Sequence, residues 1–207
     1  MEQQANGRKE SEMTVLVAYA SKYGATKGIA ERIADKLRQM GKVVDVKPAG
    51  AVGDIGDYEA FVIGSAVYSG SWLPEAAEFV RSHSATLVVR PVWLFSSGPL
   101  GADVKEPKGQ EKGTDEFPGQ IKIFGSKRTI HWPLPKEIVE FRSSIGPRDH
   151  EMFFGALDHK KLPFAERMAM LAVGGMEGDF RDWGSIDAWA EAIARQLTPA
   201  GATPGQA

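Results

Sequence analysis

The sequence predicts an α/β fold built on a doubly wound parallel sheet of five strands. Continuous apolar runs of strand length, which are typical of strands buried on both faces, alternate with segments of helical periodicity. This alternation favours parallel strands joined by helical crossovers. The first apolar run also passes into a helical segment through small and hydroxyl residues, as in folds that bind a phosphate at a helix N-terminus.

The first three strands are predicted from apolar runs in the early part of the chain. Thr14–Tyr19 is the first, and the helix after it is expected to end at Gly41. Apolar residues recur at helical spacing in this helix: Ile29, Ile33, Leu37 and Met40. Val43–Val46 is expected to form a short second strand, and Ala60–Gly64 a buried third strand.

The later strands are separated by longer connections. A helix is expected to begin at Pro74, because proline is tolerated in a first helical turn. Leu87–Phe95 is predicted as the fourth strand and Met152–Gly155 as the fifth, with a short helix at Pro135–Arg142 before it. We expect no regular structure in Ala102–Trp132, where glycine, proline and charged residues predominate. A loop of this length in a compact domain is usually functional or disordered.

The last helix is predicted from apolar residues at helical spacing: Ile186, Trp189, Ile193 and Leu197. Ser185 is its expected N-cap, and Asp187 is expected in its first turn. Residues 1–12 are expected to form a flexible arm, because they are polar and lack the apolar stretch of a secretory signal. Residues 198–207 are expected to be a disordered tail, which leaves one domain over residues 13–197.

Composition excludes several classes of function. The net charge of −2 gives no electrostatic footprint for nucleic acid, so no nucleic-acid partner is expected. The absence of cysteine excludes disulfides, iron–sulfur clusters and thiol redox chemistry, so redox work requires a bound cofactor. No apolar run approaches the length of a membrane-spanning helix. We expect a cytoplasmic protein with at most peripheral contact with the inner face of the membrane.

The segment Ser21–Thr26 has the composition of a phosphate-binding loop between the first strand and its helix. The helix N-terminus offers unpaired N–H groups and the positive end of the helix dipole, and the hydroxyls of Ser21 and Thr26 add donors. Gly24 permits a backbone conformation that other residues resist. The dinucleotide pattern Gly-x-Gly-x-x-Gly and the triphosphate pattern Gly-x-x-x-x-Gly-Lys-Ser/Thr are both absent. These neutral donors predict a ligand with a single terminal phosphate.

Several segments together resemble the flavodoxins. Ala20–Thr26 resembles their FMN-phosphate loop, and Val62–Gly70 is similar to their loop beside the isoalloxazine ring. Phe154–Leu157, Phe164–Met168 and Asp182–Trp183 resemble the branch that contains the bacterial menaquinone-dependent protoporphyrinogen oxidases (dehydrogenases). The resemblance covers about residues 13–197. It implies a flavodoxin-like FMN-binding domain with strand order 2-1-3-4-5 and a long insertion, about residues 102–135, after the fourth strand.

The resemblance also implies three loops that bind FMN. The first, at the phosphate, comprises Ser21, Lys22, Tyr23, Gly24, Ala25 and Thr26. The second, which flanks the ring, comprises Ser65, Ala66, Val67, Tyr68, Ser69, Gly70 and Trp72, with Tyr68 or Trp72 stacking on it. The third, along the pyrimidine side, comprises Ser96, Ser97, Gly98, Pro99, Leu100 and Gly101. Flavodoxins often place an aromatic residue in the third loop, so Pro99 and Leu100 leave one ring face open to a substrate or to the insertion.

Some of these residues also have ordinary structural interpretations. Tyr68 and Trp72 are equally compatible with packing aromatics, and a lysine at a loop tip such as Lys22 is more often solvated. The four histidines lack metal-ligand spacing, so no metal site is predicted, and no catalytic side chain is assigned because the cofactor carries the chemistry. The segment Asp179–Trp183 either binds a substrate or forms a salt-bridged turn before the last helix.

Two functions compete for this chain, with FMN as the expected cofactor in both. It is either an oxidoreductase on a small organic or tetrapyrrole substrate with a quinone acceptor, or an electron shuttle that docks onto redox partner proteins. A domain that has lost FMN or holds a different flavin, and serves as a binding module, is a third alternative. Shuttle flavodoxins are typically strongly acidic, so the net charge of −2 favours the enzyme. Ile121–Ile130 with Trp132 either contacts a quinone or membrane or packs on its own domain.

Overall fold

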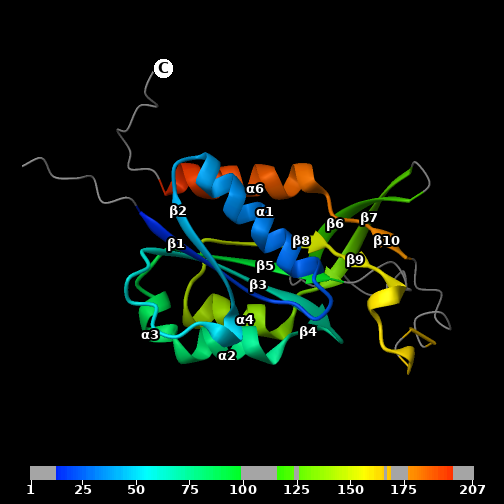
Figure 1. Cartoon of the computed structure of the whole chain (residues 1–207), viewed down its shortest axis with the longest axis horizontal. Coiled ribbons are helices and arrows are strands. Elements are labelled where there is room, and N and C mark those ends of the chain that lie inside the picture. The colour runs from blue at the N-terminus through cyan, green and yellow to red at the C-terminus, as the bar shows by residue number, and fades with distance from the viewer. Residues whose placement is uncertain (1–12, 99–115, 124–125, 166, 169–176, 198–207) are drawn as a thin grey trace, which may run out of the picture.

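The computed structural model of the chain describes residues 13–98, 116–123, 126–165, 167–168 and 177–197. The expected arm (1–12) and tail (198–207) lie outside these residues. Five parallel strands form the central sheet in the order β2-β1-β3-β5-β8 (Figure 1). They are β1 (Thr14–Ala20), β2 (Val43–Pro48), β3 (Ala60–Tyr68), β5 (Val92–Gly98) and β8 (Asp149–Phe154). The predicted fold class is therefore confirmed, and numbering these five strands consecutively gives the expected order 2-1-3-4-5.

Helices cover both faces of this sheet, as Figure 1 shows. Helices α1 (Ala25–Gln39) and α6 (Trp183–Gln196) lie on one face, and α2 (Pro74–Ser82), α3 (Ser84–Leu87) and α4 (Lys136–Ser144) lie on the other. Alternate residues of β1 enter different cores: Val15 and Val17 pack with residues of α1 and α6, whereas Leu16 packs with residues of α2 and α4. This burial on both faces explains why the strands are continuous apolar runs.

Five further elements among the described residues are only two or three residues long. Strand β4 (Ser71–Trp72) pairs antiparallel with the end of β3. Strands β9 (Ala156–Leu157) and β10 (Gly178–Asp179) pair with each other, and η1 (Ala49–Ala51) and η2 (His159–Lys161) are single 3₁₀ turns. No helix of the part of the chain that the structure describes is long and apolar enough to cross a membrane.

Two predicted element boundaries are wrong. The fourth strand was expected at Leu87–Phe95, but Leu87 ends α3 and the strand begins only at Val92, after Pro91. The proline lacks an N–H group and separates the helical turn from the ladder. The expectation of no regular structure in Ala102–Trp132 is also wrong for its second half, where β6 (Glu116–Ile123) and β7 (Ser126–Pro133) form an antiparallel hairpin.

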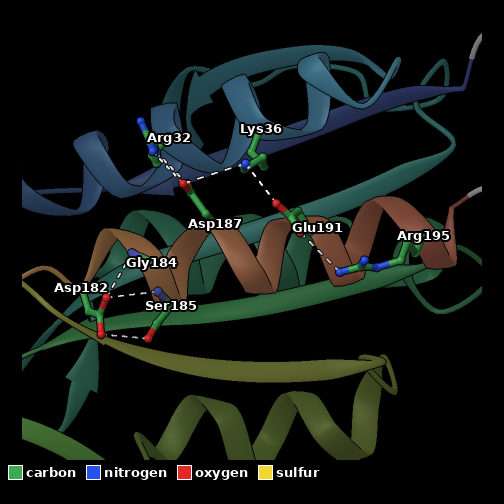
Figure 2. A network of polar contacts seen from close by, with 8 residues as sticks. All are labelled: Arg32, Lys36, Asp182, Gly184, Ser185, Asp187, Glu191 and Arg195. Carbon is green, nitrogen blue, oxygen red and sulfur yellow. Dashed lines mark hydrogen bonds and ion pairs between the residues drawn. The ribbon is translucent and has the colours of Figure 1, made fainter. Parts of the chain in front are cut away.

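The last helix begins earlier than expected because a different residue caps it. Asp182 is the N-cap, and its Oδ1 accepts hydrogen bonds from the backbone N–H groups of Gly184 and Ser185 at 3.0 and 3.1 Å (Figure 2). Ser185 is therefore inside the helix, and Asp187 lies beyond its first turn. Asp187 instead accepts two hydrogen bonds of 2.6 Å from the guanidinium of Arg32. This ion pair fastens α6 to α1.

Candidate functional site

The carboxyl ends of three adjacent parallel strands bring the three predicted loops to one edge of the sheet. Ala20, at the end of β1, is in register with Ser65 on β3, and Ser65 is in register with Ser96 on β5. The segments that follow these positions therefore leave the sheet side by side. This edge is where doubly wound sheets bind their ligands.

The N-terminus of α1 is open at this edge. Gly24 is its N-cap, with a φ of 93°, and no side chain among the described residues caps the helix. The Gly28 N–H bonds to the Gly24 carbonyl at 3.0 Å, so the earlier amides of Ala25 and Thr26 have no acceptor within the helix. The first turn carries no acidic residue. By contrast, the N-terminus of α6 is satisfied by Asp182, so only α1 of these two helices presents unused donors to an anion.

The side chain of Ser21 stabilises the turn before α1 as a hydrogen-bond acceptor, and its hydroxyl can still donate to a ligand. The Gly24 N–H donates to Ser21 Oγ at 3.0 Å. Since this bond uses Ser21 as an acceptor, its own O–H is left to point elsewhere. A Cβ on Gly24 would meet no atom within 4 Å, so the space above this residue is open. The site therefore combines hydrogen-bond donors, open space and the positive end of the helix dipole. These features suit a terminal phosphate group such as the one in FMN.

The second predicted loop is a tight hairpin at the end of a strand. Ser65–Tyr68 belong to β3, and the chain reverses at Ser69 and Gly70, whose φ angles are 51° and 74°. Two consecutive positive φ angles are typical of a type I′ turn. Tyr68 immediately precedes this turn and is 43% exposed. Its ring is thus accessible at the edge where the resemblance places the isoalloxazine ring.

Of the two interpretations of Trp72, ring-stacking residue or packing aromatic, the structure fits the packing aromatic. Trp72 is 3% exposed, and its indole packs edge-on against Phe141 of α4, with ring centroids 5.6 Å apart. Its Nε1–H donates to Ser96 Oγ at 2.8 Å, and its backbone N–H donates to the buried carboxylate of Glu137 at 3.0 Å. Trp72 therefore anchors the hairpin in the core.

The hydroxyls of Ser65 and Ser96 are also used inside the protein. Ser65 Oγ accepts from the Leu73 N–H and donates to the Ala66 carbonyl, both at 2.9 Å. Ser96 Oγ accepts from Trp72 and lies 2.9 Å from His150 Nε2. Both serines are fully buried. Their side chains therefore fix the second and third loops instead of facing a ligand.

His150 and Glu137 belong to this buried network, and sequence reasoning missed both. Burial, which is the largest cause, and the positive charge of Arg142 together lower the pKa of His150 from 6.5 to about 4, and Asp149 opposes them only in part. Which of Ser96 Oγ and His150 Nε2 donates depends on the imidazole tautomer, and either direction continues the hydrogen-bonded chain Trp72–Ser96–His150. The sequence shows a histidine just before the predicted fifth strand and a glutamate in the predicted helix that precedes it, but it does not show which residues they contact.

The third predicted loop is only partly described. Ser96, Ser97 and Gly98 are the last residues of β5, and Pro99, Leu100 and Gly101 lie outside the described residues. Gly155, at the end of β8, packs closely here: a Cβ on it would lie 3.4 Å from Ser97 Oγ and 3.7 Å from the Ala25 Cβ. The ends of β5 and β8 thus meet the start of α1, beside the phosphate-binding loop.

The segment before α6 forms the salt-bridged turn that was one of its two interpretations. The guanidinium of Arg181 bonds to both carboxylate oxygens of Asp179 and lies 4.4 Å from the centroid of the Trp183 ring. The hydrogen bonds from Arg181 hold the pKa of Asp179 below its ordinary value. Arg181 also rests on α1 at Gly28, where the lack of a side chain makes room for it.

Comparisons with known proteins agree with this geometry. A family model described as a flavodoxin domain matches residues 16–183. The chain is similar to a flavodoxin from the domain Archaea, with 16% identity, a TM-score of 0.53 and coverage of 89% of this chain and 98% of that one. Oxidised Flavodoxin 2 from Bacillus cereus has 16% identity and a TM-score of 0.51, with coverage of 89% and 99%.

A larger protein contains a domain of the same fold. The rubredoxin oxygen:oxidoreductase from Desulfovibrio gigas is 16% identical, with a TM-score of 0.53 over 89% of this chain. This chain spans only 36% of the length of that enzyme. No curated protein sequence matches the chain. At these identities the solved structures show the fold alone.

Proposed function

Because the chain belongs to the flavodoxin domain family, whose cofactor is FMN, we propose that it oxidises a small organic substrate through bound FMN and passes the electrons to a quinone. Bound FMN supplies hydride or electron acceptance at its ring. The task of the protein is then to hold the cofactor, to shape the electrostatic field at the ring and to admit the substrate.

The proposed phosphate site is the open N-terminus of α1. Its donors are the amides of Ala25 and Thr26 and the Ser21 hydroxyl, and the positive φ of Gly24 aims the turn toward the ligand. Tyr68 is the proposed stacking residue, because it is the exposed aromatic at the second loop. Backbone groups of the turn Ser69–Gly70 and of Ser97–Gly101 are the proposed polar contacts of the ring edge.

The attachment of the insertion supports an enzyme over a shuttle. The insertion leaves the sheet after Gly98, and the chain returns at α4, where the Lys136 N–H donates to the Gly70 carbonyl at 3.4 Å. Both anchors flank the proposed ring position, so the intervening residues start and finish beside the ring face that the resemblance leaves open. A shuttle instead needs an exposed ring and a strong field for docking, and a net charge of −2 supplies little.

The resemblance to menaquinone-dependent protoporphyrinogen oxidases makes protoporphyrinogen the first substrate to test and menaquinone the first acceptor. Under anaerobic conditions with added menaquinone as the electron acceptor, the FMN-loaded protein is expected to oxidise protoporphyrinogen faster than the same concentration of free FMN. A rate equal to that of free FMN, with rapid electron exchange with a redox protein, would assign the chain to the shuttles. A protein that binds no FMN in titration calorimetry would refute both functions.

A loop replacement tests the role assigned to the insertion. Replacing residues 102–133 by a short Gly/Ser linker is expected to retain FMN, because the proposed phosphate donors all lie in the turn after β1 and in the first turn of α1. Substrate oxidation is expected to fall to the rate of free FMN. Retention of full activity in this variant would contradict the proposal that the insertion covers the substrate at the open ring face.

A further inference from the structure

Lys22, in the first loop, lies next to two tyrosine rings that come from different loops. Its Nζ is 5.2 Å from the ring centroid of Tyr23 and 5.4 Å from that of Tyr68. An ammonium within about 6 Å of a ring centroid is attracted to the aromatic face. Lys22 follows β1 and Tyr68 ends β3, and these strands pair in parallel. The two contacts therefore join the first and second loops.

These contacts fix the position of a positive charge at the edge of the sheet. The ammonium of a lysine at a loop tip is ordinarily surrounded by water and salt, which screen its field within about 10 Å. Two ring faces instead keep the Lys22 ammonium beside Tyr68, which is 43% exposed and is the aromatic proposed to flank the flavin. The charge is thus close to the proposed position of the ring as well as to the phosphate-binding loop.

We propose that Lys22 stabilises reduced FMN relative to oxidised FMN, and thereby raises the reduction potential of the cofactor. This proposal rests on the FMN site proposed above. Two electrons and one proton enter the ring on reduction, so the ring becomes more negative by one charge, and a fixed cation favours that state. The phosphate has the same charge in both states. Donors to the phosphate therefore change both affinities equally, whereas a cation at the ring changes their ratio.

The test measures that ratio in the full-length protein. Apoprotein is titrated with oxidised FMN and, anaerobically in dithionite, with reduced FMN, and the two-electron midpoint is measured against a reference dye. Lys22→Gln is expected to weaken the binding of reduced FMN about tenfold more than that of oxidised FMN, which corresponds to a midpoint about 30 mV lower. Lys22→Arg is expected to restore the wild-type midpoint, because a guanidinium also carries the charge and lies on aromatic faces.

Lys27 offers a matched control on the same stretch of chain. It is exposed on α1, and its Nζ lies 3.6 Å from Glu31 Oε1 of the same helix. Lys27→Gln is expected to leave the midpoint within the error of the wild type. Tyr23→Leu keeps the Lys22 charge but removes one of the rings that hold it. It is expected to lower the midpoint by less than Lys22→Gln does.

Each alternative outcome identifies what has failed. Equal weakening of both redox states by Lys22→Gln would assign Lys22 to the phosphate and overturn the proposal. An unchanged ratio with normal FMN binding would also overturn it, and would leave the proposed FMN site intact. Failure of the wild-type protein to bind FMN in either state would refute the proposed function, and with it the proposal that Lys22 raises the reduction potential.

Discussion

The buried imidazole of His150 is expected to make the stability of the protein depend on pH. Its pKa is lowered from 6.5 to about 4, and the largest cause is burial, which leaves the imidazolium without solvating water. The positive charge of Arg142 also lowers the pKa of His150, whereas the negative charge of Asp149 raises it by a smaller amount. In the unfolded chain the imidazole returns to water, where its ordinary pKa applies.

The sign and size of the effect follow from these two pKa values. As the pH falls below 6.5, the unfolded state takes up a proton that the native state refuses, so the free energy of unfolding decreases. The loss is about 2 kcal/mol at pH 5 and approaches about 3 kcal/mol near pH 4, at 1.36 kcal/mol per unit of pKa. Above about pH 7 both states are neutral, and His150 contributes no pH dependence.

His150→Gln isolates this contribution from the carboxylates that also titrate in acid. Urea unfolding of the apoprotein, followed by tryptophan fluorescence, gives the free energy of unfolding of both proteins between pH 5 and pH 8. The difference between them is expected to be constant above pH 7 and to shift by about 2 kcal/mol in favour of the variant at pH 5. Parallel pH profiles would refute the assignment. Ser96→Ala, which removes the hydrogen bond but keeps the buried imidazole, is expected to retain the wild-type pH dependence.

Three further substitutions test separate features. Gly64→Ala places a methyl group against the ring of the fully buried Phe95, so about 3 kcal/mol of the free energy of unfolding should be lost in urea titrations; a loss within error would show that the ring can move. Asp182→Ala removes the cap of α6 and should cost about 1 kcal/mol by the same measurement, with an unchanged midpoint as the contrary result. Gly24→Ala strains a φ of 93°, and calorimetry should show weaker FMN binding and a stability loss of about 1 kcal/mol, whereas wild-type affinity would argue against the phosphate site.

The main sheet was predictable because its strands carry their signal locally. Val15, Leu16 and Val17 are apolar without interruption, since both faces of β1 are covered. The hairpin β6–β7 was missed although Ile121 and Ile123 alternate with polar residues, because Pro118 and Gly119 obscured the period of two.

The features of the site that were missed depend on distant partners. Trp72 was compatible with either stacking on a ring or packing, and its position is decided by Phe141 and Glu137 of α4, far along the chain. No local pattern contains that information. The open end of α1 was predictable, because a glycine and hydroxyl residues directly between a strand and a helix determine the geometry within a few residues.

The pairing of the first and last helices has a consequence for synthesis of the chain. The Arg32–Asp187 bond links residues 155 positions apart, and Ile186 and Ile193 share a core with Ile29. A nascent chain still lacking its final helix would leave this core open to water on one side. The hydrophobic core between α1 and α6 can therefore form only after α6 has been translated. Until then the nascent chain exposes apolar side chains of α1, to which chaperones can bind.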